Sequence, residues 1–170
     1  MERALGKFIT EVGDIENVMF ETILAVSDED PNEVHRKFYS ETFGPKIEML
    51  KKFAKGDAFD EHRKQMDHLH GMLEKLREQR NNLIHGETYY LTRRGEFKVF
   101  RVGFTRRNLT PWKGFDFKGN AANIFTADQV DDVNSYCIAI KTDLNYIRNK
   151  VVKKLTGVEP PYISHVFELD

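Results

Sequence analysis

The chain has 170 residues, of which 40% are hydrophobic and 31% are charged, and its formal net charge is −1. This length favours one domain with a working core, and the composition is ordinary for a folded globular protein. A net charge near zero excludes a strong overall field toward nucleic acid or membrane, so any such attraction must come from a local patch.

The cysteine content and the lengths of the apolar runs indicate the cellular location of the protein. Cys137 is the only cysteine, which excludes an internal disulfide and a cysteine metal site. The first residues lack the apolar core of a signal peptide, and no run of 18 apolar residues is present to span a membrane. We therefore expect a cytoplasmic protein without a membrane partner.

The first half of the chain carries three helix signals. Apolar spacing predicts a first helix over residues 2–27. Its stripe contains Leu5, Phe8, Val12, Ile15, Met19 and Val26, with Ile9 and Ile23 beside it. Asp30-Pro31 predicts the start of a second helix, because Asp caps helices and Pro suits the first helical position. Gly44-Pro45 breaks that segment and starts a third helix over residues 45–55, which Gly56 ends.

A fourth helix is predicted over residues 58–85, where side chains recur alternately every three and four residues. This spacing is a seam of period 3.5. The seam contains Phe59, His62, Met66, Leu69, Leu73, Leu76, Arg80 and Leu83. Arg80 therefore places a cation on a mostly apolar seam, and Gly86 is the expected C-cap.

The sequence changes character after residue 86. Aromatic and β-branched residues on both sides of Arg94-Gly95 predict a β-hairpin at 87–104. Pro, Gly and Asn predict a loop at 105–125. Thr126 and Gln129 then fit a capping box that opens a fifth helix over residues 126–156. Its apolar face contains Val130, Val133, Cys137, Ile140, Leu144, Ile147 and Val151.

Gly157 and Pro160-Pro161 close the fifth helix, so residues 158–170 are expected to form an extended tail. The predicted architecture is mostly α: a bundle of four to five helices in a single domain over residues 1–157, with the hairpin and a basic loop inserted at 87–125.

The candidate catalytic residues are Arg80, Asn81 and His85. Asn81 and His85 are one i,i+4 step apart and share a helix face. Arg80 lies about 140° round an ideal helix from His85, so its long side chain must curl to join them. Histidine transfers protons near neutral pH, and arginine stays charged and grips phosphate. These residue types suit metal-independent RNA cleavage, which needs a base for the 2′-hydroxyl, an acid for the leaving oxygen and a cation for the phosphorane.

The Arg80-Asn81-x3-His85 string, followed by Gly86 near the end of a long helix, resembles the motif of HEPN domains, a family in which many members cut RNA. The motif occupies residues 80–86, and the helical layout extends the resemblance to most of the chain; the hairpin is not part of the minimal family core. The resemblance implies a HEPN-like fold in which His85 is the acid/base, Arg80 the phosphate clamp and Asn81 the positioning residue.

The resemblance also implies partners. RNA would be the substrate, and two subunits would form a homodimer through the motif helix, so that two copies of the motif line one cleft. A toxin or phage-defence setting would add an antitoxin or nucleotidyltransferase partner. Catalysis would need no cofactor.

Simpler roles remain open for each motif residue. Arg80 could reach from the bundle edge to a carboxylate such as Glu16 or Glu48. His85 could only cap its helix, and Asn81 could be a solvated surface residue. The protein would then be a non-catalytic HEPN-type binding or dimerisation module, or a structural helical scaffold. An enzyme predicts the motif in an open cleft, whereas a scaffold predicts an internal ion pair for Arg80.

Residues 91–120 form a local basic segment in which eight basic residues face two acidic ones, for a net charge of +6. Basic side chains track phosphates, and exposed aromatics stack on unpaired bases. The candidate RNA-binding residues are Arg93, Arg94, Lys98, Arg101, Arg106, Arg107 and Trp112. The alternative is a solvated basic hairpin whose aromatics cover the bundle, and a buried Trp112 would favour it.

His62, His68 and His70 are the residues closest to a metal-binding pattern. On a helix His68 and His70 point about 160° apart, and His62 and His68 are not an i,i+4 pair. The three side chains cannot readily converge on one ion, so no metal site is predicted. Cys137 lies on the apolar face of the last helix and is expected in the core.

Overall fold

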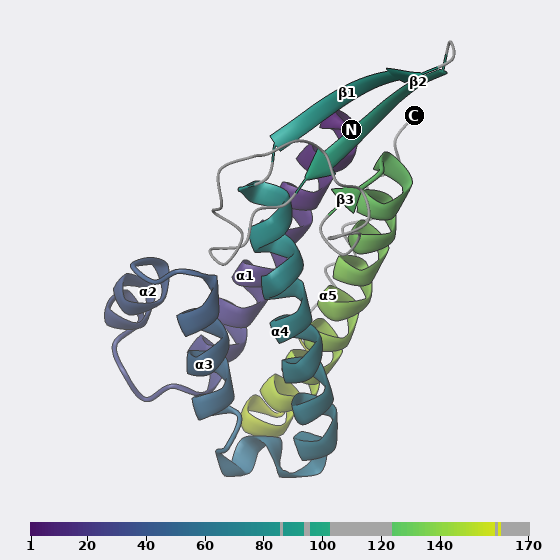
Figure 1. Ribbon diagram of the computed structural model, residues 1–170. Coiled ribbons are helices and arrows are strands. Elements are labelled where there is room, and N and C mark those ends of the chain that lie inside the picture. The colour runs from purple at the N-terminus through teal and green to yellow at the C-terminus, as the bar shows by residue number, and fades with distance from the viewer. Residues whose placement is uncertain (86, 94–95, 103–123, 159, 161–170) are drawn as a thin grey trace.

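The computed structural model describes residues 1–85, 87–93, 96–102, 124–158 and 160, with the backbone alone for 87–93, 96–102 and 124. The described chain is mostly helical (Figure 1). Its helices are α1 (Glu2–Val26), α2 (Pro31–Tyr39), α3 (Phe43–Phe53), the 3₁₀ helix η1 (Asp57–His62), α4 (Arg63–Ile84) and α5 (Ala127–Thr156).

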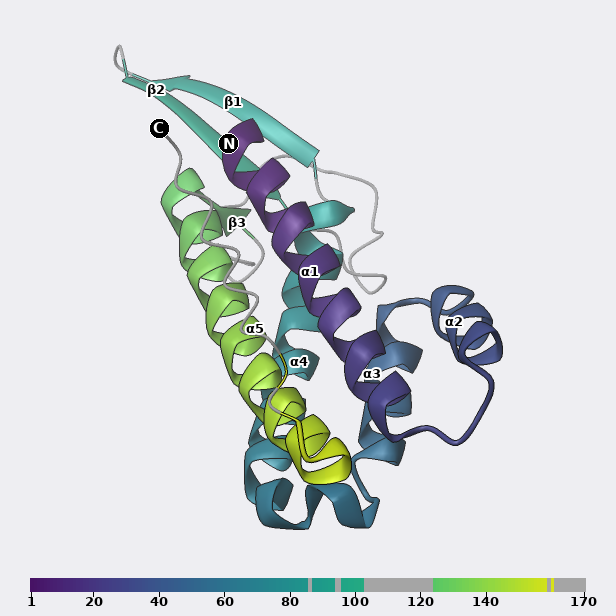
Figure 2. The same cartoon turned by 180° about the vertical axis from the view of Figure 1, so that it is seen from behind.

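Three long helices, α1, α4 and α5, run side by side, and α2 and α3 lie beside the C-terminal half of α1 (Figures 1 and 2). The apolar stripes of the three long helices meet in one core. The residues predicted for the α5 face are all buried, as are the apolar seam residues of η1 and α4. On α1, Phe8, Val12, Ile15 and Met19 are buried, whereas Ile9 is 58% exposed and does not belong to the core.

Side-chain caps fix the starts of α2 and α5. The Asp30 carboxylate accepts hydrogen bonds from the backbone N–H groups of Asn32 (2.9 Å) and Glu33 (3.3 Å). At α5, Thr126 Oγ1 accepts from the Gln129 N–H (3.3 Å), and Gln129 Oε1 accepts from the Thr126 N–H (2.9 Å). The capping box predicted from the sequence is thereby confirmed.

Three predicted boundaries are wrong, each for a local reason. Helix α3 begins at Phe43 rather than at residue 45, because a proline is tolerated in the first turn, where the N–H groups have no helical partner. Residues 58–62, expected in the fourth α-helix, belong to the tighter η1. Ile124–Phe125, expected in a loop, form strand β3.

Strands β1 (Glu87–Arg93) and β2 (Glu96–Val102) pair antiparallel, and β3 adds to the other edge of β2. The β1–β2 register runs from Glu87 opposite Val102 to Arg93 opposite Glu96. Both strands fall within 87–104, where the sequence predicts a hairpin. Residues 94–95 and most of the predicted loop and tail lie outside the described residues. The sheet lies across the end of the bundle at which α4 finishes (Figures 1 and 2).

Ion pairs join the helices around the core. Lys46 Nζ lies 2.5 Å from Glu16 Oε2, and the two side chains are only 7% and 17% exposed, so this pair ties α3 to α1. Lys46 also lies over the rings of Phe38 and Tyr39, which belong to α2. None of the helices in the described part of the chain has the length and apolar character needed to cross a bilayer.

Candidate functional site

The predicted motif occupies the last turns of α4 and its C-cap. Helix α4 ends at Ile84, and the backbone N–H of His85 donates to the Asn81 carbonyl oxygen (3.2 Å). Asn81 and His85 are exposed, whereas Leu83 between them is fully buried and anchors the helix end in the core. The structure therefore presents the amide and the imidazole to solvent about one helical turn apart.

Arg80 lies differently from its two neighbours. It is half-buried, and its guanidinium carbon is 5.5 Å from the centroid of the Phe43 ring at the start of α3. Its Nε is shielded from solvent and has no hydrogen-bond partner. The side chain thus leans toward α3, where a cation–π contact holds it.

Arg80 is not neutralised by the carboxylates that the sequence offered. Glu16 pairs with Lys46, and Glu48 lies beside His70. The alternative role of Arg80, an ion pair with a carboxylate such as Glu16 or Glu48, is not seen among the described residues. Across the residues that the structure describes, Arg80 forms no ion pair, and its guanidinium contacts the Phe43 ring.

Arg77 is a second cation beside the motif, and the sequence analysis missed it. Its guanidinium pairs with Glu74 (2.8 Å) and is about half exposed. A Cβ built on Gly44 would lie 3.3 Å from Arg77 Cδ and Nη1, so the glycine leaves the room in which the arginine lies. The sequence did contain a pattern that indicates Arg77: the i,i+3 spacing places Arg77 and Arg80 on neighbouring positions of one helix face.

The predicted RNA-binding residues are only partly located. Arg93, Lys98 and Arg101 lie on β1 and β2, at register positions opposite Glu96, Leu91 and Thr88. Arg94, Arg106, Arg107 and Trp112 lie outside the described residues. Since β1 starts directly after the motif, Arg101 belongs to the near end of the ribbon. Arg93 is five residues further along than Thr88, the partner of Arg101, which is about 17 Å at ~3.3 Å per strand residue.

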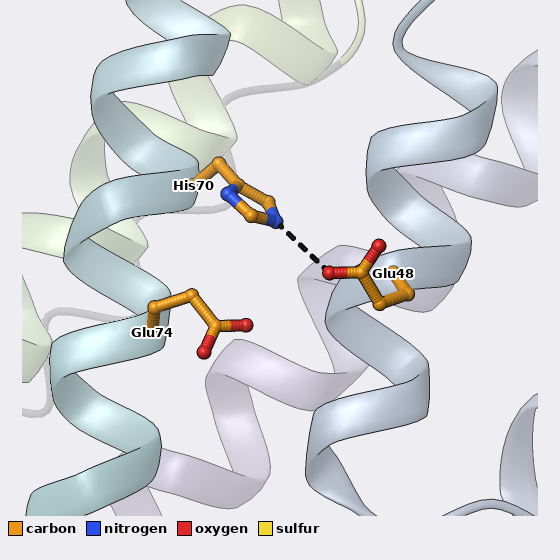
Figure 3. Close-up of side chains that lie close together, drawn as sticks. All are labelled: Glu48, His70 and Glu74. Carbon is orange, nitrogen blue, oxygen red and sulfur yellow. Dashed lines mark ion pairs between the residues drawn. The ribbon is translucent and has the colours of Figure 1, made fainter.

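A different group of side chains meets between α3 and α4, two turns before the motif. Figure 3 shows His70 and Glu74 of α4 facing Glu48 of α3. One ligand atom from each residue lies within 4.8 Å of the other two. The other two histidines of α4 and η1 stay apart from it: His62 Nδ1 shares a hydrogen bond with Gln65 Oε1 (2.7 Å), and His68 is exposed.

Neither glutamate of this group was predicted from the sequence, where only the three histidines had a metal-binding pattern. The i,i+4 spacing of His70 and Glu74 was a visible signal, but Glu48 joins them only because α3 packs on α4.

In comparisons with known proteins, no family model, no curated protein and no solved structure matches this chain.

Proposed function

We propose that this chain is a HEPN-like domain that cleaves RNA without a metal ion, using Arg80, Asn81 and His85. The supporting observation is the end of α4, where an exposed imidazole and an exposed amide stand one turn apart. An arginine without a carboxylate partner, among the described residues, directly precedes them. Such a set offers a proton-transfer group and a phosphate-binding cation at a surface that a long polymer can reach.

Each residue has a defined part in the proposed reaction. His85 removes the proton of the 2′-hydroxyl, whose oxygen attacks the adjacent phosphorus, or returns a proton to the departing 5′-oxygen. Arg80 stabilises the charge that develops on the phosphorane oxygens. Asn81 hydrogen-bonds the phosphate or the ribose and fixes its position. The products would be a 2′,3′-cyclic phosphate and a 5′-hydroxyl.

One imidazole cannot easily serve as base and acid in the same turnover. The proposal therefore includes a homodimer through the motif helix, so that a second His85 faces the first across a shared cleft. The exposure of Asn81 and His85 in the single chain is compatible with a partner at this end of α4. The basic segment 91–120 would guide the RNA, and an antitoxin or nucleotidyltransferase partner would control the activity.

The second candidate is a non-catalytic module of the same class that binds RNA or a protein partner. The position of Arg80 favours it, because the guanidinium lies on Phe43 with its Nε buried. Catalysis requires the side chain to leave that ring or to reach the phosphate with its outer nitrogens alone.

RNA cleavage by matched variants separates the two candidates. Purified protein is incubated with mixed RNA in EDTA, and His85→Ala is compared with His68→Ala, which removes an exposed histidine of the same helix. We expect loss of cleavage, by about 100-fold or more, for His85→Ala and full activity for His68→Ala. Arg80→Lys keeps the charge but not the planar fork, and should lose most activity without loss of helical content. Equal cleavage by wild type and His85→Ala would refute the nuclease.

RNA binding and solution size complete the test. If the wild type retains RNA in a gel-shift assay but yields no new RNA ends, the binding module is correct. Light scattering gives the oligomeric state, and a monomer at assay concentration would remove the shared cleft from the mechanism.

A further inference from the structure

We propose that Glu48, His70 and Glu74 form a binding site for a first-row divalent metal ion such as Zn²⁺, which joins α3 to α4. This site takes no part in the proposed RNA cleavage. Its three donors are one imidazole nitrogen and two carboxylate oxygens, which together suit Zn²⁺, Mn²⁺, Fe²⁺ or Ni²⁺.

One pair of donor atoms already stands at a distance close to that of a bound state, and the third donor lies nearby. His70 Nε2 is 3.6 Å from Glu48 Oε1. Two ligands at about 2.05 Å from a tetrahedral zinc lie roughly 3.3 Å apart. The third donor, from Glu74, lies within 4.8 Å of both. Glu48 and Glu74 are long side chains, 63% and 31% exposed, so small rotations can bring their oxygens in.

The state of His70 distinguishes this arrangement from an ordinary surface ion pair. The His70 side chain is only 19% exposed, and its Nε2 is shielded from water without a hydrogen-bond partner. The 3.6 Å separation from Glu48 is too long for a hydrogen bond. The buried Nε2 faces two carboxylates, but neither is close enough to accept a hydrogen bond from it. A cation between the three groups would give this nitrogen the partner that a buried polar atom needs.

The surroundings support the site in two further ways. His70 and Glu74 are i,i+4 neighbours on α4, so the helix itself holds two of the ligands together. Arg77 pairs with one oxygen of Glu74 (2.8 Å) and would orient that carboxylate from outside the ligand set. Water would complete the coordination from the exposed side of Glu48.

Cobalt and zinc titrations of the full chain test the site. The protein is stripped with EDTA and dialysed, Co²⁺ is followed by its visible d–d absorption, and Zn²⁺ by thermal unfolding. We expect saturable absorption at one ion per chain. Zn²⁺ at about 100 times Kd should raise Tm by roughly 5–10 °C.

Matched variants on α4 locate the ligands. We expect no Co²⁺ absorption and no rise of Tm with Zn²⁺ in either His70→Gln or Glu74→Gln. Glu48→Gln should weaken both effects. His68→Gln and Glu78→Gln change exposed residues of the same helix and should behave as wild type. Circular dichroism of the stripped variants verifies that they are folded, and Glu74→Gln keeps the test valid if His70→Gln does not fold.

Two results would overturn the proposal. One is a wild type without Co²⁺ absorption and without a Zn²⁺ shift. The other is an equal loss of binding in His68→Gln or Glu78→Gln, which would mean diffuse surface binding. Because RNA cleavage is not measured here, neither result bears on the nuclease.

Discussion

The buried ion pair between Lys46 and Glu16 should contribute strongly to stability, because the two charges satisfy each other where little water reaches. Lys46→Met keeps the length of the side chain and its contact with the Phe38 ring, but leaves Glu16 unpaired at 17% exposure. Loss of one partner of a buried pair costs about 3–5 kcal/mol. Because the Glu16 side chain is partly exposed to solvent, we expect Lys46→Met to lower the free energy of unfolding by about 3 kcal/mol, the low end of that range.

Urea unfolding of a double-mutant cycle measures this contribution. Glu16→Met alone should also destabilise, whereas Lys46→Met with Glu16→Met should be close to wild type, because no unpaired charge remains. The exposed Lys37–Glu29 pair, also 2.5 Å long, is the control, and Lys37→Met should cost less than about 1 kcal/mol. A cost below ~1 kcal/mol for Lys46→Met, or additive single mutants, would refute the reasoning.

Three further predictions concern single positions. Burial raises the pKa of the Cys137 thiol to about 12, so a thiol reagent at pH 8 should label the protein only after urea unfolding. Because the unfolded thiol ionises first, stability should fall as pH rises past about 9, and less so in Cys137→Ala. Thr126→Ala removes the side-chain cap of α5 and should lower the free energy of urea unfolding by about 1 kcal/mol. Thr142→Ala changes a threonine inside the same helix and should leave the free energy of unfolding nearly unchanged. Gly157→Ala forces a side chain onto φ = 72° and should lower stability by ~1 kcal/mol; an unchanged urea midpoint would contradict this.

The long helices could be predicted because each has a regular apolar stripe and a local stop signal. On α5, seven apolar residues, a capping box and a terminal glycine all indicate one helix. Shorter features depend on competition that local sequence does not decide. The Gly44-Pro45 pair looks like a break, yet it lies inside the first turn of α3, where the proline loses no helical hydrogen bond.

The candidate site was predictable only along a single helix. The positions of Asn81 and His85 follow from helical spacing, but Arg80 meets Phe43 because α3 packs on α4. The same packing brings Glu48 to His70. Such contacts between segments about 20–40 residues apart leave no periodic signal in the sequence, since many helix arrangements are compatible with the same stripes.

The chemical nature of the RNA ends tests the central claim most directly. The wild type, incubated with RNA in EDTA, should yield 2′,3′-cyclic phosphate and 5′-hydroxyl ends, and His85→Ala should yield neither. An RNA with a 2′-deoxyribose at the cut position should resist the wild type. Intact RNA after prolonged incubation with a dimeric wild type, or the same ends from His85→Ala, would contradict catalysis by this motif.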